Sequence, residues 1–174
     1  KYGAHVNITV SNNSPLLEAC SKGHLNIVHE LLKHGADANI TVSENSPLIA
    51  ACSNGYFDVI NELLNHGADV NMIVSGMSPL TASCLIICDE KGRLYDQIKF
   101  SNFVYTRKIL DLCSKVHLNI IRALIQHGAD VNSIVSDRLP LIVACTEGHL
   151  DMVRELLKHS ADVNAMVSNN SPLL

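Results

Sequence analysis

The chain repeats itself, and this repetition constrains its fold more than any other feature of the sequence. A short phrase, Gly-Ala-Asp-Val-Asn in its commonest form, returns with a step of 32 residues that is interrupted once by a longer step. A second phrase, Ser-Pro-Leu, keeps the same register. Two independent phrases in one register indicate a tandem array of structural units. The first phrase closes at Asn7, Asn39, Asn71, Asn132 and Asn164, and the second opens at Ser14, Ser46, Ser78, Leu139 and Ser171.

Each unit carries the signals of two short helices. Ser14 is a favourable N-cap, and Pro15 suits the first helical position because its missing N–H is not needed there. Apolar residues then recur at helical spacing as far as Gly23, a residue type that permits the tight turn after a helix. A second helix with one apolar face extends to Gly35, and a short polar hairpin or loop leads to the next unit. We therefore predict an all-α stack of helix-turn-helix units with projecting hairpins or loops.

The predicted core positions keep their apolar character while the residue types vary. A single helix pair of this size cannot bury its own apolar face, whereas stacked copies share a continuous core. The sets predicted to be buried are Leu16, Leu48, Ile109 and Leu141; Leu25, Phe57, Leu118 and Leu150; Val28, Ile60, Ile121 and Val153; and the pairs Leu31-Leu32, Leu63-Leu64, Leu124-Ile125 and Leu156-Leu157.

Composition excludes several classes of protein. The 174 residues are 47% hydrophobic, which is too apolar for an intrinsically disordered chain. The formal net charge of -4 argues against a dedicated nucleic-acid binder. No apolar run is long enough to cross a bilayer, so we expect no membrane contact within this chain. Aromatic residues make up only 4% of the sequence, so the core is expected to be aliphatic.

These residues resemble the ankyrin repeat. The matching motifs are Ser-Pro-Leu, Ala19-Cys20, Gly23-His24, Leu31-Leu32 and Gly35-Ala36-Asp37-x-Asn39, and the resemblance covers residues 1–83 and 107–174. It implies an ankyrin-type solenoid. The step of 32 residues is one shorter than the usual 33, and the missing residue falls in the hairpin. The family's histidine after Pro-Leu is replaced by Leu17, Ile49, Thr81 and Ile142, which predicts a more apolar helix start.

The whole chain, residues 1–174, is predicted to be a single array. Its parts are the end of a preceding repeat (1–6), two repeats (7–38 and 39–70), an irregular unit (71–131), another repeat (132–163) and the start of a following repeat (164–174). Arrays usually finish in polar capping repeats, and neither end of this chain has that character. We therefore expect the sequence to be a fragment of a longer array.

The irregular unit allows two interpretations. The step from Pro79 to Pro140 is 61 residues, which is 29 more than one repeat. The segment 84–107 is either an inserted loop with some helix or a decayed extra repeat. We slightly favour the decayed repeat because both helical registers survive in its sequence. Val116 stands where other units have glycine, and because a β-branched residue resists positive φ, the turn there must differ.

The cysteines and histidines first suggest disulfide or metal chemistry. Successive helices pack about 8–10 Å apart, whereas a disulfide needs Cα atoms within roughly 7 Å, so thiols repeated once per unit should not pair. Histidines repeated in the same way cannot converge on one zinc ion. We predict buried thiols, a reducing compartment, histidines that bond the last carbonyls of the second helices, and no metal or other cofactor. The cysteines sharing one slot are Cys20, Cys52, Cys84, Cys113 and Cys145, and the helix-end histidines are His34, His66, His127 and His159.

No catalytic arrangement is evident in the sequence. It contains no phosphate-binding glycine loop, no metal-spaced His/Glu pair and no Ser/His/Asp set. By the resemblance, Asp37, Asp69, Asp130 and Asp162 help to order the hairpins rather than act as catalytic acids. We therefore predict that the chain is not an enzyme and has no catalytic residues.

The resemblance implies a module that binds a protein partner through hairpin tips and the concave face of the first helices. We expect an adaptor or scaffold that is monomeric and intracellular, in the cytoplasm or nucleus. Alternatives are a regulatory or docking arm of a larger enzyme or channel and, more weakly, a thiol-based redox or metal sensor. The candidate residues are Asn12, Asn13, Glu44, Asn45, Gly76, Met77, Asp137, Arg138, Asn169 and Asn170 at the tips; Ser21, Lys22, Ser53, Asn54, Ser114, Lys115, Thr146 and Glu147 at the ends of the first helices; and the aromatic anchors Tyr95, Phe100, Phe103 and Tyr105, which could equally fill the core of a damaged repeat.

Overall fold

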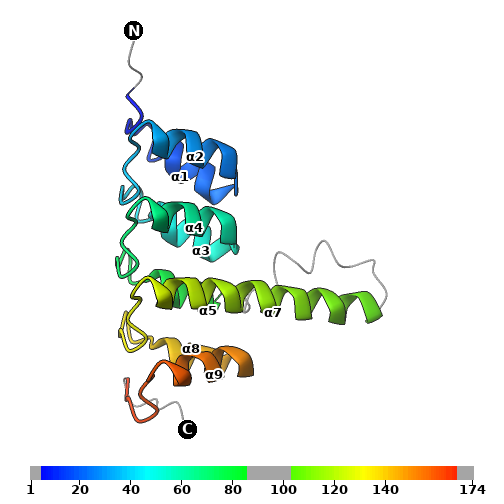
Figure 1. Ribbon diagram of the computed structural model, residues 1–174. Helices are drawn as coiled ribbons and strands as arrows, with labels where there is room; N and C mark the ends of the chain where they lie inside the picture. Colours follow the sequence, from blue (N-terminus) through cyan, green and yellow to red (C-terminus); the bar gives the residue numbers. More distant parts are fainter. Residues whose placement is uncertain (1–4, 86–102, 168–174) are drawn as a thin grey trace.

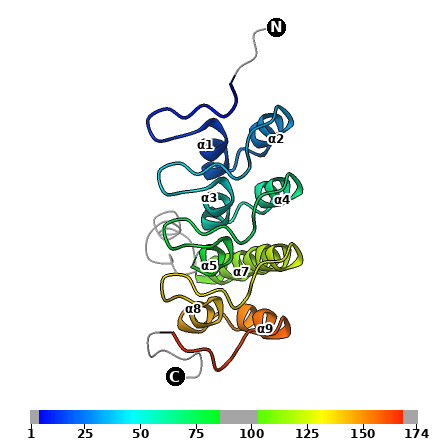
Figure 2. The ribbon, with the colours of Figure 1, turned by 90° about the vertical axis from the view of Figure 1, so that its left-hand side faces the viewer.

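The described part of the chain forms a stack of four helix pairs with hairpins projecting along one edge. The computed structural model describes residues 5–85 and 103–167, and for residues 103–114 it describes the backbone alone. The first helices of the pairs form one column and the second helices form another (Figure 2). The pairs are α1 (Pro15–Ser21) with α2 (Leu25–Lys33), α3 (Pro47–Asn54) with α4 (Phe57–Asn65), α5 (Pro79–Leu85) with α7 (Phe103–Gln126), and α8 (Pro140–Thr146) with α9 (Leu150–Lys158).

The first helices begin where the sequence predicts. The Ser14 hydroxyl accepts a hydrogen bond from the backbone N–H of Leu17 at 3.1 Å, and Ser46 does the same for Ile49 at 3.3 Å. Proline follows each cap, where it needs no N–H partner. α8 follows Leu139, which has no capping side chain, so this helix begins without that hydrogen bond. Serine caps thus account for most of the first-helix starts, whereas α2, α4 and α9 begin without a side-chain cap.

The core is continuous through the stack. Within each column a helix packs on its counterpart in the next unit, as α1 does on α3 and α2 on α4. Leu63, Leu124 and Leu156 are fully buried at equivalent positions of three successive units. The predicted solenoid with a shared aliphatic core is confirmed for the described residues.

Three of the leucines predicted to be buried are exposed. Leu25 and Leu150 are 37% and 57% exposed because their position, the first residue of the second helix, lies at the rim of the core. Leu157 is 41% exposed, although its counterparts Leu32 and Leu64 are buried. The helices of Leu32 and Leu64 are each covered by the second helix of the next unit, whereas no described helix packs beyond α9.

The helix α7 replaces the expected turn near Val116 with an uninterrupted helix. Its C-terminal part, from Leu118, corresponds to the second helices of the other units, and its N-terminal part extends beyond the ends of those helices (Figure 1). Val116 is partly buried against the core, which suits a helical residue. Ile109 and Cys113 lie on this helix where only the backbone is described, and most of the segment 84–107 lies outside the described residues.

The links between units are tight hairpins. Isolated antiparallel bridges close each one, as between Val42 and Asn45, and two residues form each tip. Both tip residues have positive φ, for example 50° at Ser43 and 60° at Glu44. This is the pattern of a two-residue type I′ turn, whose twist matches that of the flanking arms. The two-residue tip explains how these repeats are one residue shorter than usual.

Candidate protein-binding surface

Asparagine side chains join neighbouring units into a ladder. The Asn39 amide donates to the Gly67 carbonyl at 3.0 Å and accepts the Asp69 backbone N–H at 2.7 Å. Each such amide therefore ties the base of one hairpin to the base of the next. The same pair of bonds is made by Asn7 to Gly35 and Asp37, by Asn71 to Gly128 and Asp130, and by Asn132 to Ser160 and Asp162.

The aspartates order the turns at the hairpin bases. The Asp69 carboxylate accepts the backbone N–H of Asn71 at 2.9 Å, and Asp130 does the same for Asn132. Asp37 and Asp162 repeat this contact. The hairpin-ordering role implied by the resemblance is therefore confirmed.

The hairpin tips lie one residue earlier than the sequence predicts. Asn12, Glu44, Gly76 and Asp137 are the second residues of the tips, and the first residue is serine in every case. The Ser43 hydroxyl donates to the Asn12 carbonyl at 2.7 Å, so neighbouring tips touch. A Cβ on Gly76 would overlap the Ser136 hydroxyl oxygen, which places a third tip against a fourth. The tip serines, Ser11, Ser43, Ser75 and Ser136, were missed, although their constancy among the copies was a usable signal.

The residues after the tips belong to the second hairpin arms. The Asn13 and Asn45 side-chain oxygens accept the next backbone N–H at 2.8 and 2.9 Å, so these amides serve the fold. Met77 is partly buried against the core. Arg138 is exposed and is therefore the member of this set that is free of the core.

The ends of the first helices are polar and mostly exposed. Ser21, Asn54 and Thr146 each donate a side-chain hydrogen bond to a carbonyl of their own helix. Lys22 and Ser53 are exposed, whereas Glu147 is partly buried. Lys115 is exposed within α7, and Ser114 lies where only the backbone is described.

The aromatic anchors stay a prediction. Tyr95 and Phe100 lie outside the described residues, as do the tip residues Asn169 and Asn170. Phe103 and Tyr105 are on α7, in the part described by backbone alone.

Three of the four helix-end histidines bond a carbonyl of the last turn, as predicted. The Nδ1 atoms of His34, His66 and His127 lie 2.8–2.9 Å from the carbonyl oxygen four residues earlier. His159 instead lies with Nε2 3.4 Å from the Glu155 carboxylate. These rings therefore serve helix ends.

The cysteine slot is buried in three units and exposed in the fourth. Cys20, Cys52 and Cys84 are buried thiols, and burial raises the pKa of both Cys20 and Cys52 to about 12. Cys145 is exposed, so the prediction of a buried thiol is wrong there. Cys145 lies on α8, and no described first helix packs beyond it.

Side-chain contacts join the second helices of neighbouring units. The Arg122 guanidinium donates to the Glu155 carboxylate at 3.0 Å, and His29 contacts Glu62 at 2.8 Å in the equivalent geometry. The hydrogen bond from Arg122 holds the pKa of Glu155 below its usual value, against the opposing effect of burial. These contacts link the second helices from unit to unit.

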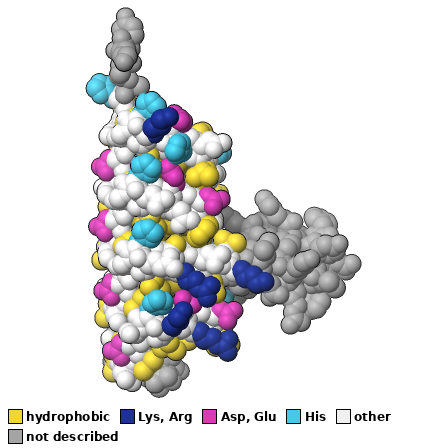
Figure 3. All heavy atoms as spheres, viewed as in Figure 1, with side chains coloured by type: hydrophobic (Ala, Val, Ile, Leu, Met, Phe, Trp, Pro, Cys, Tyr) yellow, Lys and Arg dark blue, Asp and Glu magenta, His cyan; other side chains and the backbone are white. Residues whose placement is uncertain are grey.

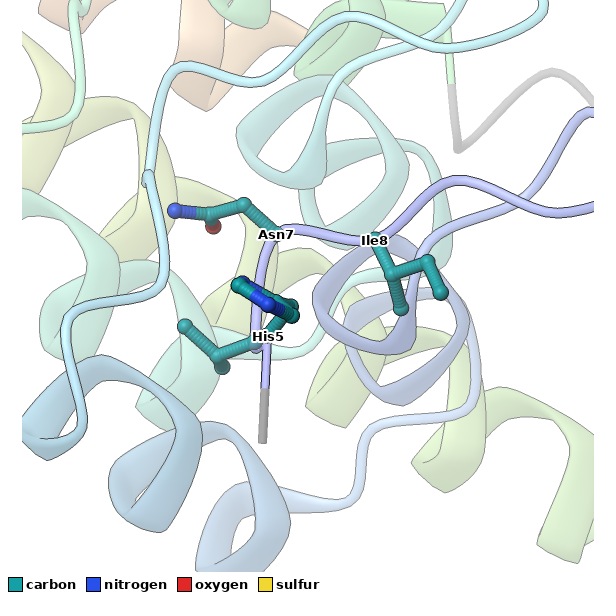
Figure 4. Close-up of a pocket in the computed structure, with 4 residues that line it drawn as sticks. His5, Asn7 and Ile8 are labelled. Atoms are coloured by element: carbon teal, nitrogen blue, oxygen red, sulfur yellow. The ribbon is translucent and has the colours of Figure 1, made fainter. Parts of the chain in front are cut away.

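A hollow of about 470 Å³ lies at the first asparagine of the ladder and is lined by His5, Val6, Asn7 and Ile8 (Figure 4). The Asn7 side chain points to the neighbouring loop, whose backbone it bonds. The Asn7 amide is already used by the fold, so His5 supplies the other polar side chain of this hollow.

The described residues contain no cluster of side chains suited to binding a metal ion. Among them, no three His, Cys, Asp or Glu side chains come close enough to hold an ion. None of the described helices combines the length and the apolar character needed to span a membrane.

The fold and its surface define a class of protein: a helical repeat solenoid whose exposed hairpins and first helices present an extended surface. The sequence matches the family model of ankyrin repeats, in three copies, over residues 2–74 and 102–167. The chain therefore belongs to the ankyrin repeat family. Ankyrin repeats are generally protein–protein interaction modules and are typically not enzymes. A comparison with curated proteins gives no significant match.

Proposed function

We propose that this chain is an adaptor or scaffold that binds a protein partner through its hairpin tips and the ends of its first helices. The observation that carries the proposal is the exposure of these side chains along a stack whose hairpin bases are already tied together by the asparagine ladder. Asn12 and Glu44 at the tips, and Lys22 and Ser53 at the helix ends, are exposed.

Hairpins and first helices adjoin each other along the whole stack (Figure 2). A partner could therefore contact several units at once, and many modest contacts would add up to a specific interface. We also propose that the chain works as a monomer in the cytoplasm or nucleus. Cys20, Cys52, Cys84 and Cys145 form no disulfide with one another, which supports a reducing compartment.

A matched pair of double variants tests this surface. Lys22→Glu with Ser53→Arg alters two first-helix ends, whereas Lys33→Glu with Asn65→Arg makes the same kind of change at two second-helix ends. All four positions are exposed, so both variants should fold. Mass spectrometry measures how much of each protein is captured by the unaltered chain and by each variant.

We expect the first-helix variant to lose specific partners about tenfold or more, as truncation of an interface centre does, and the second-helix variant to keep them. Equal retention by both variants, or loss in the second-helix variant alone, would overturn the proposed surface. Circular dichroism and size-exclusion chromatography establish that both variants keep the fold.

A further inference from the structure

An exposed apolar row runs along the hairpins. Ile73, Ile134 and Met166 occupy the same position in the first arms of three successive hairpins, and their side chains are 56%, 54% and 64% exposed. In the first two hairpins this position holds the hydroxyl residues Thr9 and Thr41. We call Ile73, Ile134 and Met166 the apolar row.

Ile73 and Ile134 are exposed on hairpins in the interior of the stack, whereas Met166 lies at the end of the described residues. Asn71 bonds both Gly128 and Asp130, so the hairpins of Ile73 and Ile134 are direct neighbours. Side chains alternate along an extended arm. Val135 is 3% exposed and faces the core, so the adjacent Ile134 points the opposite way, into solvent.

The hairpin edge around the row is acidic. The backbone carbonyls of Asp69 and Asp130 accept the N–H groups of Met72 and Ser133. Each aspartate therefore begins a turn that ends directly before a row residue. Acidic side chains recur along this edge, which is at the left in Figure 3, and lysine and arginine gather over the helices instead. On the described hairpins and their bases the acidic residues are Asp37, Glu44, Asp69, Asp130, Asp137 and Asp162, and the basic residue is Arg138.

We propose that the apolar row binds an extended segment of a partner protein that carries an apolar side chain about every third residue, with lysine or arginine between. This proposal rests on the proposed function and names the chemistry of the partner. Successive units of packed helices lie about 8–10 Å apart, and a polyproline II segment returns to the same face every three residues, about 9 Å. Its apolar side chains therefore meet successive members of the row.

The charges then fix the remaining positions of the segment. Its basic side chains lie against the aspartates at the hairpin bases, where the complementary charge favours encounter and register. An acidic segment of the same shape would be repelled. The acidic edge also disfavours anionic membranes and nucleic acids as occupants, because both carry the same sign of charge.

Fluorescence anisotropy with designed peptides tests the proposal. The probe is a fluorescein-labelled peptide of four Leu-Lys-Pro triplets, which is held in the polyproline II conformation by its prolines. One control peptide replaces lysine with glutamate, and the other replaces leucine with glycine. The protein variants are Ile134→Thr, which installs the residue already present at Thr41, and Thr41→Ile, which lengthens the row by one unit.

We expect the lysine peptide to bind, the two control peptides to bind at least tenfold more weakly, and binding to weaken as salt is raised. Ile134→Thr should weaken binding about fivefold and Thr41→Ile should strengthen it by a similar factor, since each changes one half-exposed side chain. Binding that does not distinguish the peptides, or that ignores both variants, overturns the proposal.

The two proposals fail separately. If capture of natural partners still depends on Lys22 and Ser53 while the lysine peptide does not bind, the chain remains an interaction module and only the assignment of the apolar row is wrong. If capture fails and the peptide binds as expected, the first-helix surface is wrong and the row stands.

Discussion

Gly23 combines two demands that only glycine meets. Its φ is +71°, and a Cβ there would lie 2.8 Å from the ring of Tyr56 in the next unit. Gly148 has nearly the same φ, +74°, but has no neighbouring atom within 4 Å of a built Cβ. Comparing substitutions at Gly148 and Gly23 therefore separates the cost of positive φ from the cost of the clash with Tyr56.

We predict that Gly148→Ala lowers the unfolding free energy by about 1–2 kcal/mol, which is the penalty of left-handed backbone for an L-residue. Gly23→Ala should lose a further 1–3 kcal/mol, roughly the penalty of overpacking, because Tyr56 must also move. Urea denaturation followed by circular dichroism measures both. Equal losses in the two variants would mean that Tyr56 moves aside freely.

Glu155 makes stability depend on pH. Its pKa is lowered in the folded chain, first by the hydrogen bond from Arg122. A carboxyl group with a lowered folded pKa contributes stability above its unfolded value, near 4.3, and this contribution is lost as the pH falls through the folded pKa.

We predict that Glu155→Gln destabilises the chain by about 1–3 kcal/mol at pH 7, and that the difference from the unaltered chain shrinks below about pH 4. The control is Arg154→Gln, which removes an ion pair with Asp151 in which both side chains are 68% exposed. That change should cost less than about 0.5 kcal/mol. Urea titrations at several pH values decide the matter, and a pH-independent difference for Glu155→Gln would contradict it.

The thiols should differ in reactivity. Burial holds the pKa of Cys52 at about 12, whereas Cys145 is exposed. We predict that a thiol reagent labels Cys145 within minutes and labels Cys52 only after unfolding, because the buried thiol is both inaccessible and protonated. Peptide mapping by mass spectrometry assigns each label. Rapid labelling of Cys20 and Cys52 in the folded chain would favour the thiol-sensor alternative.

At the scale of the helix, equivalent positions of the repeats differ in how deeply they are buried. Leu63 and Leu31 occupy the same repeat position, yet Leu63 is fully buried and Leu31 only partly. We predict that Leu63→Ala costs about 2–5 kcal/mol and Leu31→Ala clearly less. Denaturation of the two variants tests this order, and equal losses would contradict the burial difference.

The sequence predicts the elements well because their signals are local. Ser14 caps a helix, Gly55 ends one and His34 bonds its last turn, and each effect depends on residues within one turn. The uninterrupted helix through Val116 was not predicted, since its sequence echoes two separate helices. Exposure at Cys145 and Leu157 depends on what packs beyond them, which repeat spacing alone does not reveal.

The candidate surface was predicted less well than the fold. Asn13 and Asn45 were predicted to be tip residues, but they lie after the tips and bond the hairpin backbone, whereas the constant tip serines connect neighbouring tips at Ser43. Hydrogen bonds between units, as at Asn39, require knowing which residues face each other across the stack. Repeat patterns locate these positions without saying what each side chain contacts.

At the scale of the whole molecule, the asparagine ladder should govern cooperativity. Asn71, which follows α4, makes the two hydrogen bonds that join its hairpin base to the hairpin base after α7. We predict that Asn71→Ala lowers stability by about 1–3 kcal/mol and broadens the urea transition, because repeat arrays unfold unit by unit when an interface weakens. A lower m-value measures the broadening.

Asn7→Ala is the control for this prediction, because Asn7 makes the same bonds at one end of the described stack. It should lower the midpoint slightly and leave the m-value unchanged, since no unit becomes separated from the rest. Identical m-values for the two variants would contradict the role of Asn71 in cooperativity.

The bond from Asn71 to Gly128 spans 57 residues of chain, whereas its counterparts at Asn39 and Asn132 span 28. The entropy of closing a loop grows only with the logarithm of its length, so doubling the span adds about 0.6 kcal/mol. The connection between α5 and α7 can therefore change in length or in sequence at little thermodynamic penalty, while the units on either side stay in register.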